Sequence, residues 1–191
     1  MAIRSFLAFE LPHEIRSGIS DVSIDLRKSG LNVKWVNVDN IHLTILFLGN
    51  IEEDDIHPME DSIGKICDKY SSFDISLEGI GLFPDIRKPR VIWLGLGGNI
   101  DRMGNFRDDL QGILSPFGIK KENRAFKPHI TLGRFRNPTG KNGELGKYLT
   151  RYRSISSPVY TVNELFLFKS ELKPSGARYT RINSWMLTGK K

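Results

Sequence analysis

Two short stretches decide how this chain folds: residues 41–49 read IHLTILFLG, and residues 128–136 read PHITLGRFR. Each holds a histidine, one apolar residue and a threonine, inside a run of the apolar and β-branched residues that strands favour. Side chains alternate between the two faces of a strand, so each histidine shares a face with its threonine, roughly 7 Å along the strand. The repeat therefore predicts two strands in equivalent positions, each with a polar face and an apolar face.

Around these stretches, segments with strand periodicity alternate with amphipathic segments of helical spacing. Helices are predicted from Pro12 to about Lys28 and over 56–70, 100–117 and 145–152. Strands are predicted over 4–11, 33–36, 41–48, 73–82, 90–96, a short piece around Ile119, 129–135, 160–168 and 179–187.

Several of these strands follow one another without a helix between them. Residues 33–36 and 41–48 are expected to form a hairpin. A second strand pair, 73–82 with 90–96, is joined by the exposed, basic loop FPDIRKPR at 83–90, and the last two strands by KSELKPSGAR at 169–178. Adjacent strands among helices predict an α+β fold with mainly antiparallel sheets, rather than a doubly wound parallel sheet.

Composition narrows the class of protein. The 191 residues suffice for one ordinary domain or two small lobes that share a core, and 39% hydrophobic with 26% charged residues is typical of globular chains. No apolar run approaches the roughly 20 residues of a membrane helix, and the amino terminus becomes charged before a signal-peptide core could form. We therefore expect a cytoplasmic protein. Cys67, the single cysteine, excludes an intrachain disulfide and is expected to fill the core.

The four histidines fall into two classes. His13 and His57 lie near predicted helix starts and are expected at the surface. Alone, His42 or His129 would be read as an ordinary strand residue, but two copies of one motif favour a shared site. If the two strands lie side by side or are related by an internal twofold axis, two imidazoles and two hydroxyls converge on one small anion, such as a phosphoryl group.

The paired motifs resemble the signature of the two-histidine phosphoesterases, in particular the RNA 2′,3′-cyclic phosphodiesterases once called 2′-5′ RNA ligases. The resemblance covers nearly the whole chain and includes RSFLAFELP, GIGLFPDIRKPRVIWLGL, ENRAFKPHITLGR and LFKSELKPSGARYTRI. Glu10 stands where many relatives carry Asp. The resemblance implies one bilobal domain over residues 1–191, with two similar lobes, each an antiparallel sheet with flanking helices, around a central cleft.

The resemblance also implies a mechanism. His42 is the general acid that protonates the departing 3′ oxygen, and His129 is the general base that activates water, which leaves a 2′-phosphomonoester. Imidazole suits both roles because its unperturbed pKa, about 6.5, lies near neutral pH. Thr44 and Thr131 would donate hydrogen bonds to nonbridging phosphate oxygens. No metal and no nucleotide cofactor is implied.

The basic residues near the second motif leave alternatives open. Arg134 is a natural partner for phosphate, although strict alternation places it on the face opposite His129; a bulge at Gly133 would turn it inward, and otherwise it is a rim residue. Residues Arg87, Lys88 and Arg90, with Phe83, form either an RNA-contacting loop or a solvated hairpin. Phe9 and Tyr179 are expected in the core or a hairpin, outside the catalytic group.

Other functions remain to be weighed against hydrolysis. The formal charge of +6 and pI near 9.5 favour an anionic partner, so a non-catalytic module that binds RNA ends is the alternative. The reverse reaction, 2′-5′ ligation, would need only a 5′-hydroxyl in place of water. A metal hydrolase is disfavoured because two histidines so far apart supply too few ligands. The expected partner is RNA with a 2′,3′-cyclic phosphate end, with tRNA fragments among the candidates. The protein is expected to be a monomer that does not bind a membrane.

Overall fold

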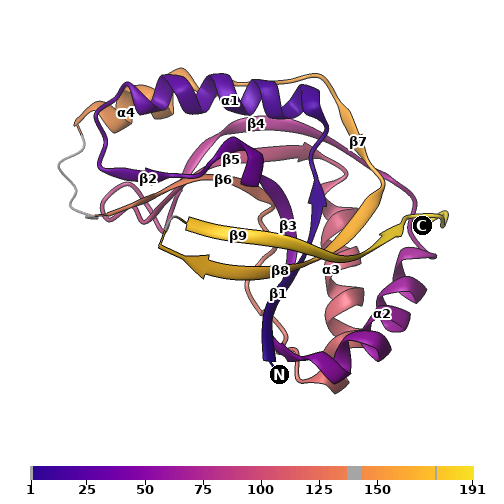
Figure 1. The fold of residues 1–191 in the computed structure, drawn as a ribbon. Coiled ribbons are helices and arrows are strands. Elements are labelled where there is room, and N and C mark those ends of the chain that lie inside the picture. Colours follow the sequence, from indigo (N-terminus) through magenta and orange to yellow (C-terminus); the bar gives the residue numbers. More distant parts are fainter. Residues whose placement is uncertain (1, 137–142, 175) are drawn as a thin grey trace.

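The chain forms two antiparallel sheets with flanking helices, seen in a computed structural model that describes residues 2–136, 143–174 and 176–191 (Figure 1). The first sheet has the strand order β3-β1-β8-β9 and the second β2-β6-β5-β4-β7. The strands of the first sheet are β1 (Ala2–Glu10), β3 (His42–Glu52), β8 (Glu164–Lys173) and β9 (Gly176–Met186). Those of the second are β2 (Val33–Trp35), β4 (Phe73–Phe83), β5 (Val91–Gly98), β6 (His129–Phe135) and β7 (Tyr160–Val162). The predicted α+β class is confirmed.

The helices are α1 (His13–Arg27), α2 (Glu53–Cys67), α3 (Ile100–Leu114) and α4 (Gly143–Arg151), with short 3₁₀ turns η1 (Val38–Asn40) and η2 (Ser115–Phe117). In Figure 1, α1 and α4 run along one side of the second sheet, while α2 lies beside α3. The hydroxyl of Tyr152, just after α4, donates to Asp25 of α1 at 2.7 Å. Cys67 ends α2 fully buried, as predicted for a core residue.

A single large core cluster contains residues of both sheets, among them Leu7 and Leu43 of the first and Ile92 and Ile130 of the second. Side chains of β1 alternate between the two faces of the first sheet, and both faces carry apolar clusters. Leu7 and Phe9 point into the large core, whereas Phe6 and Ala8 join Phe166 and Phe168 in a second, smaller cluster on the other face. Phe9 is thus a core residue, as predicted.

One predicted hairpin is wrong. Residues 33–36 and 41–48 do contain β2 and β3, but the two strands belong to different sheets. Instead β2 pairs with β6, and the amide of Val36 continues the pairing by donating to the Leu132 carbonyl at 2.9 Å. Gly133 makes this approach feasible, since a Cβ there would lie 2.4 Å from a methyl of Val33. Sequence proximity favoured the hairpin, but the fit of β2 against a glycine decided the pairing.

The other differences concern segment ends. No strand forms around Ile119, which is buried in a segment held to α3 by side chains rather than by a strand partner. The strand predicted over 160–168 is two strands, because β7 pairs with β4 in the second sheet and β8 with β1 in the first. Residues 169–178 are mostly strand, since the β8–β9 pairing continues to Lys173 opposite Gly176.

Candidate active site

The two histidine motifs lie in strands with the same irregularity. In β3, Thr44 and Leu46 lie opposite successive residues of β1, which leaves Ile45 as an extra, bulged residue. In β6, Thr131 and Gly133 lie opposite successive residues of β5, which leaves Leu132 bulged. Each bulge therefore follows the motif threonine directly. A bulge of one residue reverses the alternation beyond it, so the fifth residue after each histidine returns to the histidine's face.

These fifth residues differ in chemistry. In β3 the position is Phe47, which is 67% exposed and contacts Phe6 with ring centroids 6.1 Å apart. In β6 the position is Arg134, which is exposed and lies opposite Val91. The register thus places Arg134 on the face that carries His129, as the bulge alternative required, while its side chain still reaches solvent.

Both imidazoles are oriented by the same backbone device. The Nδ1 atom of His42 lies 2.9 Å from the carbonyl oxygen of Asn40, and that of His129 lies 2.7 Å from the carbonyl oxygen of Lys127. A carbonyl oxygen can only accept, so Nδ1 carries the proton and donates in both rings. Each Nε2 atom is then the nitrogen left to exchange a proton with a ligand.

The surroundings lower the pKa of both imidazoles, but different charged neighbours act on each ring. Burial lowers the pKa of His42, while its bond to Asn40 and the Glu10 carboxylate oppose that shift. Burial also lowers the pKa of His129, opposed by the bond to Lys127, and there the Arg134 guanidinium lowers the pKa further. Of the charged neighbours, Glu10 favours the protonated form of His42 and Arg134 favours the neutral form of His129.

Aromatic rings hold each imidazole from the sides. His42 stacks on Phe6 at 4.7 Å between centroids and meets the edge of Tyr179 at 5.0 Å. His129 meets Phe83 edge-on at 4.9 Å, and Trp93 lies 6.1 Å away. Such contacts restrict ring rotation, because a buried ring that turned would lose its packing partners.

Tyr179 lies in the β8–β9 hairpin, as predicted, and its ring also contacts His42, which the sequence did not indicate. Burial raises the pKa of its phenol, and the guanidinium of Arg134 acts against that shift. Arg134 is therefore close enough to act on both Tyr179, which touches His42, and His129. β3 and β6 contact each other, so the strands that carry the two motifs are neighbours in the fold. The sequence signal for Tyr179 was only its place in the stretch LFKSELKPSGARYTRI.

The two threonines complete the symmetric part of the site. Thr44 lies opposite Ala8 and Thr131 opposite Trp93, and both side chains are half-buried. Within the part of the chain that the structure describes, neither hydroxyl makes a hydrogen bond. Both hydroxyls are therefore available to a bound anion.

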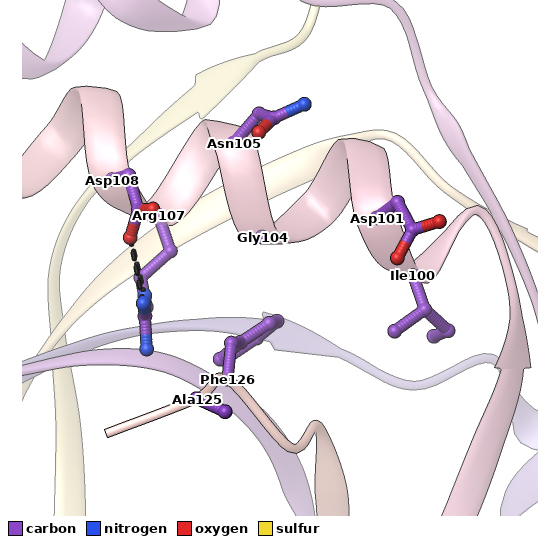
Figure 2. A pocket seen from close by; sticks show the side chains of 8 residues that line it. All are labelled: Ile100, Asp101, Gly104, Asn105, Arg107, Asp108, Ala125 and Phe126. Atoms are coloured by element: carbon purple, nitrogen blue, oxygen red, sulfur yellow. Dashed lines mark hydrogen bonds and ion pairs between the residues drawn. The ribbon is translucent and has the colours of Figure 1, made fainter. Parts of the chain in front are cut away.

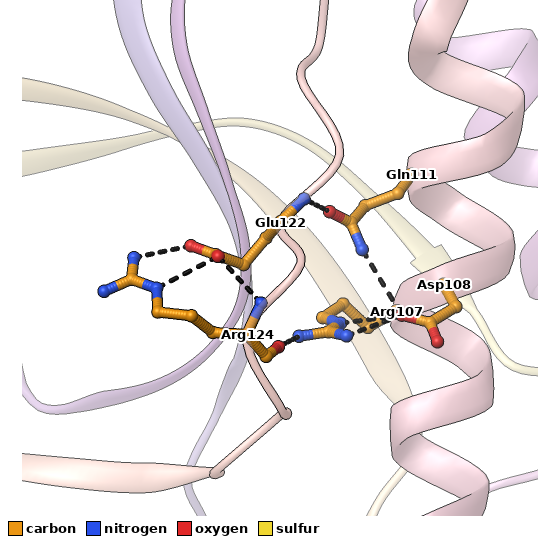
Figure 3. Close-up of polar contacts among 5 residues, drawn as sticks. All are labelled: Arg107, Asp108, Gln111, Glu122 and Arg124. Carbon is orange, nitrogen blue, oxygen red and sulfur yellow. Dashed lines mark hydrogen bonds and ion pairs between the residues drawn. The ribbon is translucent and has the colours of Figure 1, made fainter.

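The segment that leads to His129 is fixed to α3 by a polar clamp (Figure 3). The Gln111 side-chain oxygen accepts from the Glu122 amide at 2.6 Å, and the Arg107 guanidinium donates to the Arg124 carbonyl at 3.4 Å. The Arg107 side chain is only 10% exposed and is held by two bonds to Asp108, of 2.6 and 3.0 Å. This clamp fixes the approach to Lys127, whose carbonyl orients His129.

The approach to His42 is shorter and built differently. The 3₁₀ turn η1 ends at Asn40, whose amide donates to the Asn37 carbonyl at 2.9 Å. The Asn40 side chain reaches β9 and donates to the Ala177 carbonyl at 3.2 Å. The carbonyl that orients His42 is thus tied to the strand pair that carries Tyr179.

A pocket of about 330 Å³ lies beside this clamp, between α3 and the segment of Ala125 and Phe126 (Figure 2). Arg107 stacks over the Phe126 ring at 5.0 Å and forms part of its wall. None of the five predicted site residues lines it. We assign this pocket to the packing of the clamp rather than to the histidine site.

The other two histidines lie outside this site. His13 is exposed at the start of α1 and His57 is exposed near the start of α2, as predicted. Among the residues that the structure describes, no group of three or more His, Cys, Asp or Glu side chains is arranged to hold a metal ion. In this part of the chain, no helix is long and apolar enough to span a membrane.

Known proteins resemble this chain over nearly all of its length. A family model described as LigT-like phosphoesterase matches residues 9–93 and 97–179. A curated RNA 2′,3′-cyclic phosphodiesterase of Methanothermobacter thermautotrophicus is 30% identical over 187 residues, which cover 98% of this chain and all of the relative. A protein of the same name from Archaeoglobus fulgidus is 32% identical over 180 residues, 93% of this chain and 96% of the relative.

Solved structures match as well. A structure from Thermus thermophilus aligns with a TM-score of 0.81 and 27% identity, covering 99% of this chain and 100% of that one. Escherichia coli LigT, solved in complex with 3′-AMP, aligns with a TM-score of 0.74 and 27% identity over 98% and 99% of the two chains.

Proposed function

Because this chain belongs to the LigT-like phosphoesterase family, we propose that it hydrolyses the 2′,3′-cyclic phosphate ends of RNA to 2′-phosphomonoesters, with His42 and His129 as the proton carriers. The observation that carries the proposal is the matched pair of Nδ1 bonds to the carbonyls of Asn40 and Lys127. Both rings thereby offer Nε2 to a ligand, as a reaction that needs one acid and one base requires.

In the proposed reaction, His129 begins neutral and His42 protonated. Nε2 of His129 takes a proton from water as the water oxygen bonds to phosphorus, and the bond from phosphorus to the 3′ oxygen breaks. Nε2 of His42 gives its proton to that departing oxygen, so the product carries a 2′-phosphate and a free 3′-hydroxyl. Exchange with solvent then restores the starting protonation of both rings.

The charged neighbours support this division of roles. Burial lowers the pKa of both imidazoles, but the Glu10 carboxylate limits this lowering for His42, which helps an acid keep its proton, whereas Arg134 adds to it for His129, which helps a base remain neutral. The reverse assignment would place the anion beside the base and the cation beside the acid. We therefore assign His42 as the acid and His129 as the base.

Thr44, Thr131 and Arg134 are assigned to the nonbridging phosphate oxygens. The two hydroxyls are free of other hydrogen bonds within the described residues, and each follows its histidine by two positions on the same strand face. A guanidinium on the same face adds a positive charge where the phosphate carries its negative charge. These three side chains bind and stabilise phosphate, and they exchange no proton.

The wider assignments extend the same proposal. The single core that joins both sheets supports one bilobal domain over residues 1–191. We assign the protein to the cytoplasm as a monomer, with tRNA fragments among its substrates. Attack by a 5′-hydroxyl in place of water would use the same two histidines and form a 2′-5′ linkage, which needs no ATP because the cyclic phosphate is already strained.

The deciding experiment incubates the protein with an oligoribonucleotide that ends in a 2′,3′-cyclic phosphate, in EDTA and without ATP. Wild type should produce a 2′-phosphate, and His42→Ala and His129→Ala should not, whereas His57→Ala, an exposed histidine outside the site, should match wild type. An intact cyclic end after incubation with wild type would refute hydrolysis of this substrate. Retained RNA binding would then favour the RNA-end-binding module.

A further inference from the structure

A pair of like charges lies beside the site, on the face of the second sheet that carries His129. Lys34 of β2 is directly opposite Arg134 of β6 in the antiparallel register. Like charges in directly opposed cross-strand positions are destabilising. An anion bound between the two cations would offset this repulsion and would explain why the pair is present.

More cations surround this pair. The loop between β4 and β5 is attached next to it, since the Arg90 amide donates to the Phe83 carbonyl at 2.7 Å and the Arg90 carbonyl accepts from Phe135 of β6 at 3.0 Å. We call the exposed cations of this region the basic strip. Its members are Lys34, Arg87, Lys88, Arg90 and Arg136.

The strip is not neutralised by the protein itself. Within the described residues, none of its side chains forms a hydrogen bond or an ion pair. The one nearby carboxylate in the loop, Asp85, accepts from the backbone amides of Arg87 and Lys88 at 2.7 and 3.3 Å, so it does not pair with their side chains. Some arginines elsewhere are paired, for example Arg181 with Glu10 and Arg151 with Asp25.

The strip also lies next to the reacting groups. Phe83, at the start of the loop, touches the His129 ring at 4.9 Å, and Arg134 is near enough to shift the pKa of His129. A strand of RNA whose cyclic end occupies the histidine site must leave the site along some surface. An uncompensated row of cations that begins at Arg134 suits the phosphodiester backbone of that strand.

We propose that the basic strip binds the phosphodiesters upstream of the cyclic end, with Lys34 on the first of them, so that the enzyme prefers an RNA chain to a cyclic mononucleotide. The inference rests on the proposed function, because it assumes that the cyclic phosphate is the reacting group. It goes beyond that function by naming the length of substrate that the site selects and the surface that selects it.

The test compares two substrates, a 2′,3′-cyclic mononucleotide and an oligoribonucleotide with the same cyclic end. In Lys34→Gln, the ratio of kcat/KM for the oligonucleotide to that for the mononucleotide should fall about tenfold, equivalent to about 1.4 kcal/mol. The double variant Arg87→Gln/Lys88→Gln should lower the same ratio. The matched control is Lys65→Gln, which removes one exposed lysine from α2, away from the strip, and should keep the wild-type ratio.

Two further readouts separate binding from folding. Removing one cation that binds a phosphate of single-stranded RNA should reduce the slope of log(kcat/KM) against log salt by about 0.7. Lys34→Gln should also melt at or above the wild-type temperature, since it removes a like-charge pair. A stable variant with a lowered ratio and a shallower salt slope would support the strip.

An unchanged ratio and salt slope in both strip variants would overturn the inference, provided that wild type turns over the mononucleotide. That outcome would leave hydrolysis itself intact. Wild type that opens neither substrate would instead overturn the proposed function, and the inference with it.

Discussion

The β3 and β6 motifs share a backbone and differ in their neighbours. Each has the histidine bonded to the carbonyl two residues before it, the threonine two residues after it, and a bulge directly beyond. Yet the fifth position is Phe47 in one and Arg134 in the other, and burial lowers the pKa of both imidazoles, which Glu10 opposes at His42 and Arg134 reinforces at His129. The repeated backbone orients the two imidazoles alike, and the unequal neighbours support the unequal roles that we propose for them.

The supports behind the two motifs differ as well. A short 3₁₀ turn and the side chain of Asn40 fix the carbonyl behind His42. A segment clamped to α3 by Arg107 and Gln111 fixes the one behind His129. Two unrelated local structures thus hold the two imidazoles by the same hydrogen bond to a backbone carbonyl. The following experiments test how far the two halves are equivalent.

The largest effect should come from removing either imidazole. His42→Ala and His129→Ala should each lower kcat on a cyclic-ended oligoribonucleotide by about 10² to 10⁴, since each removes one partner in proton transfer. The losses should be similar, and the double variant should lose little more than either single one, because both groups act in one step. Activity near that of His57→Ala in either single variant would show that only one half is catalytic.

Removing the hydroxyls should have the next largest effect. Thr44→Val and Thr131→Val keep a β-branched side chain but remove a donor to phosphate, and each should lower kcat by up to about 10². The melting temperature should change little, because both hydroxyls are unbonded within the described residues. A loss confined to one variant would show that the phosphate is held asymmetrically, by one strand.

The clamp offers a way to disturb one half alone. Gln111→Met preserves side-chain volume but removes the acceptor of the Glu122 amide, which should cost about 1 to 3 kcal/mol of folding stability. We expect kcat to fall about tenfold as His129 loses its fixed orientation. Nitrogen NMR of the imidazoles should show a change in His129 and none in His42. Equal changes in both rings would contradict a local positioning role.

The smallest expected effect is a shift in the pH dependence of kcat/KM, at the acid limb in one variant and at the alkaline limb in another. Arg134→Gln removes a cation that lowers the pKa of His129, so this pKa should rise and the acid limb of kcat/KM should move to higher pH. Glu10→Gln removes an anion that raises the pKa of His42, so this pKa should fall and the alkaline limb should move to lower pH. Arg181→Gln, which removes the ion-pair partner of Glu10, is the control for that broken pair. If Arg134→Gln shifted the alkaline limb and Glu10→Gln the acid limb, His42 would be the base and His129 the acid.

Much of this architecture could be predicted from local patterns. Alternation predicted β3 and β6 and the shared face of His42 and Thr44, because strand geometry fixes which neighbours point together. The hairpin predicted between residues 33–36 and 41–48 was wrong because residues 33–36 pair with β6 instead. That pairing depends on Val33 packing against Gly133, a residue far along the chain. The contact of Tyr179 with His42 was not predicted for the same reason, since it crosses the sheet.

The sequence by itself determined the α+β class, the paired His-x-Thr segments and the family resemblance, because these depend on residue order and on the fixed period of a strand. Only the tertiary structure decided which charge lies beside which histidine, that a bulge returns Arg134 to the face of His129, and that Lys34 stands opposite it. Electrostatic and packing effects depend on distance in space, and for residues far apart in the chain that distance is set by the fold.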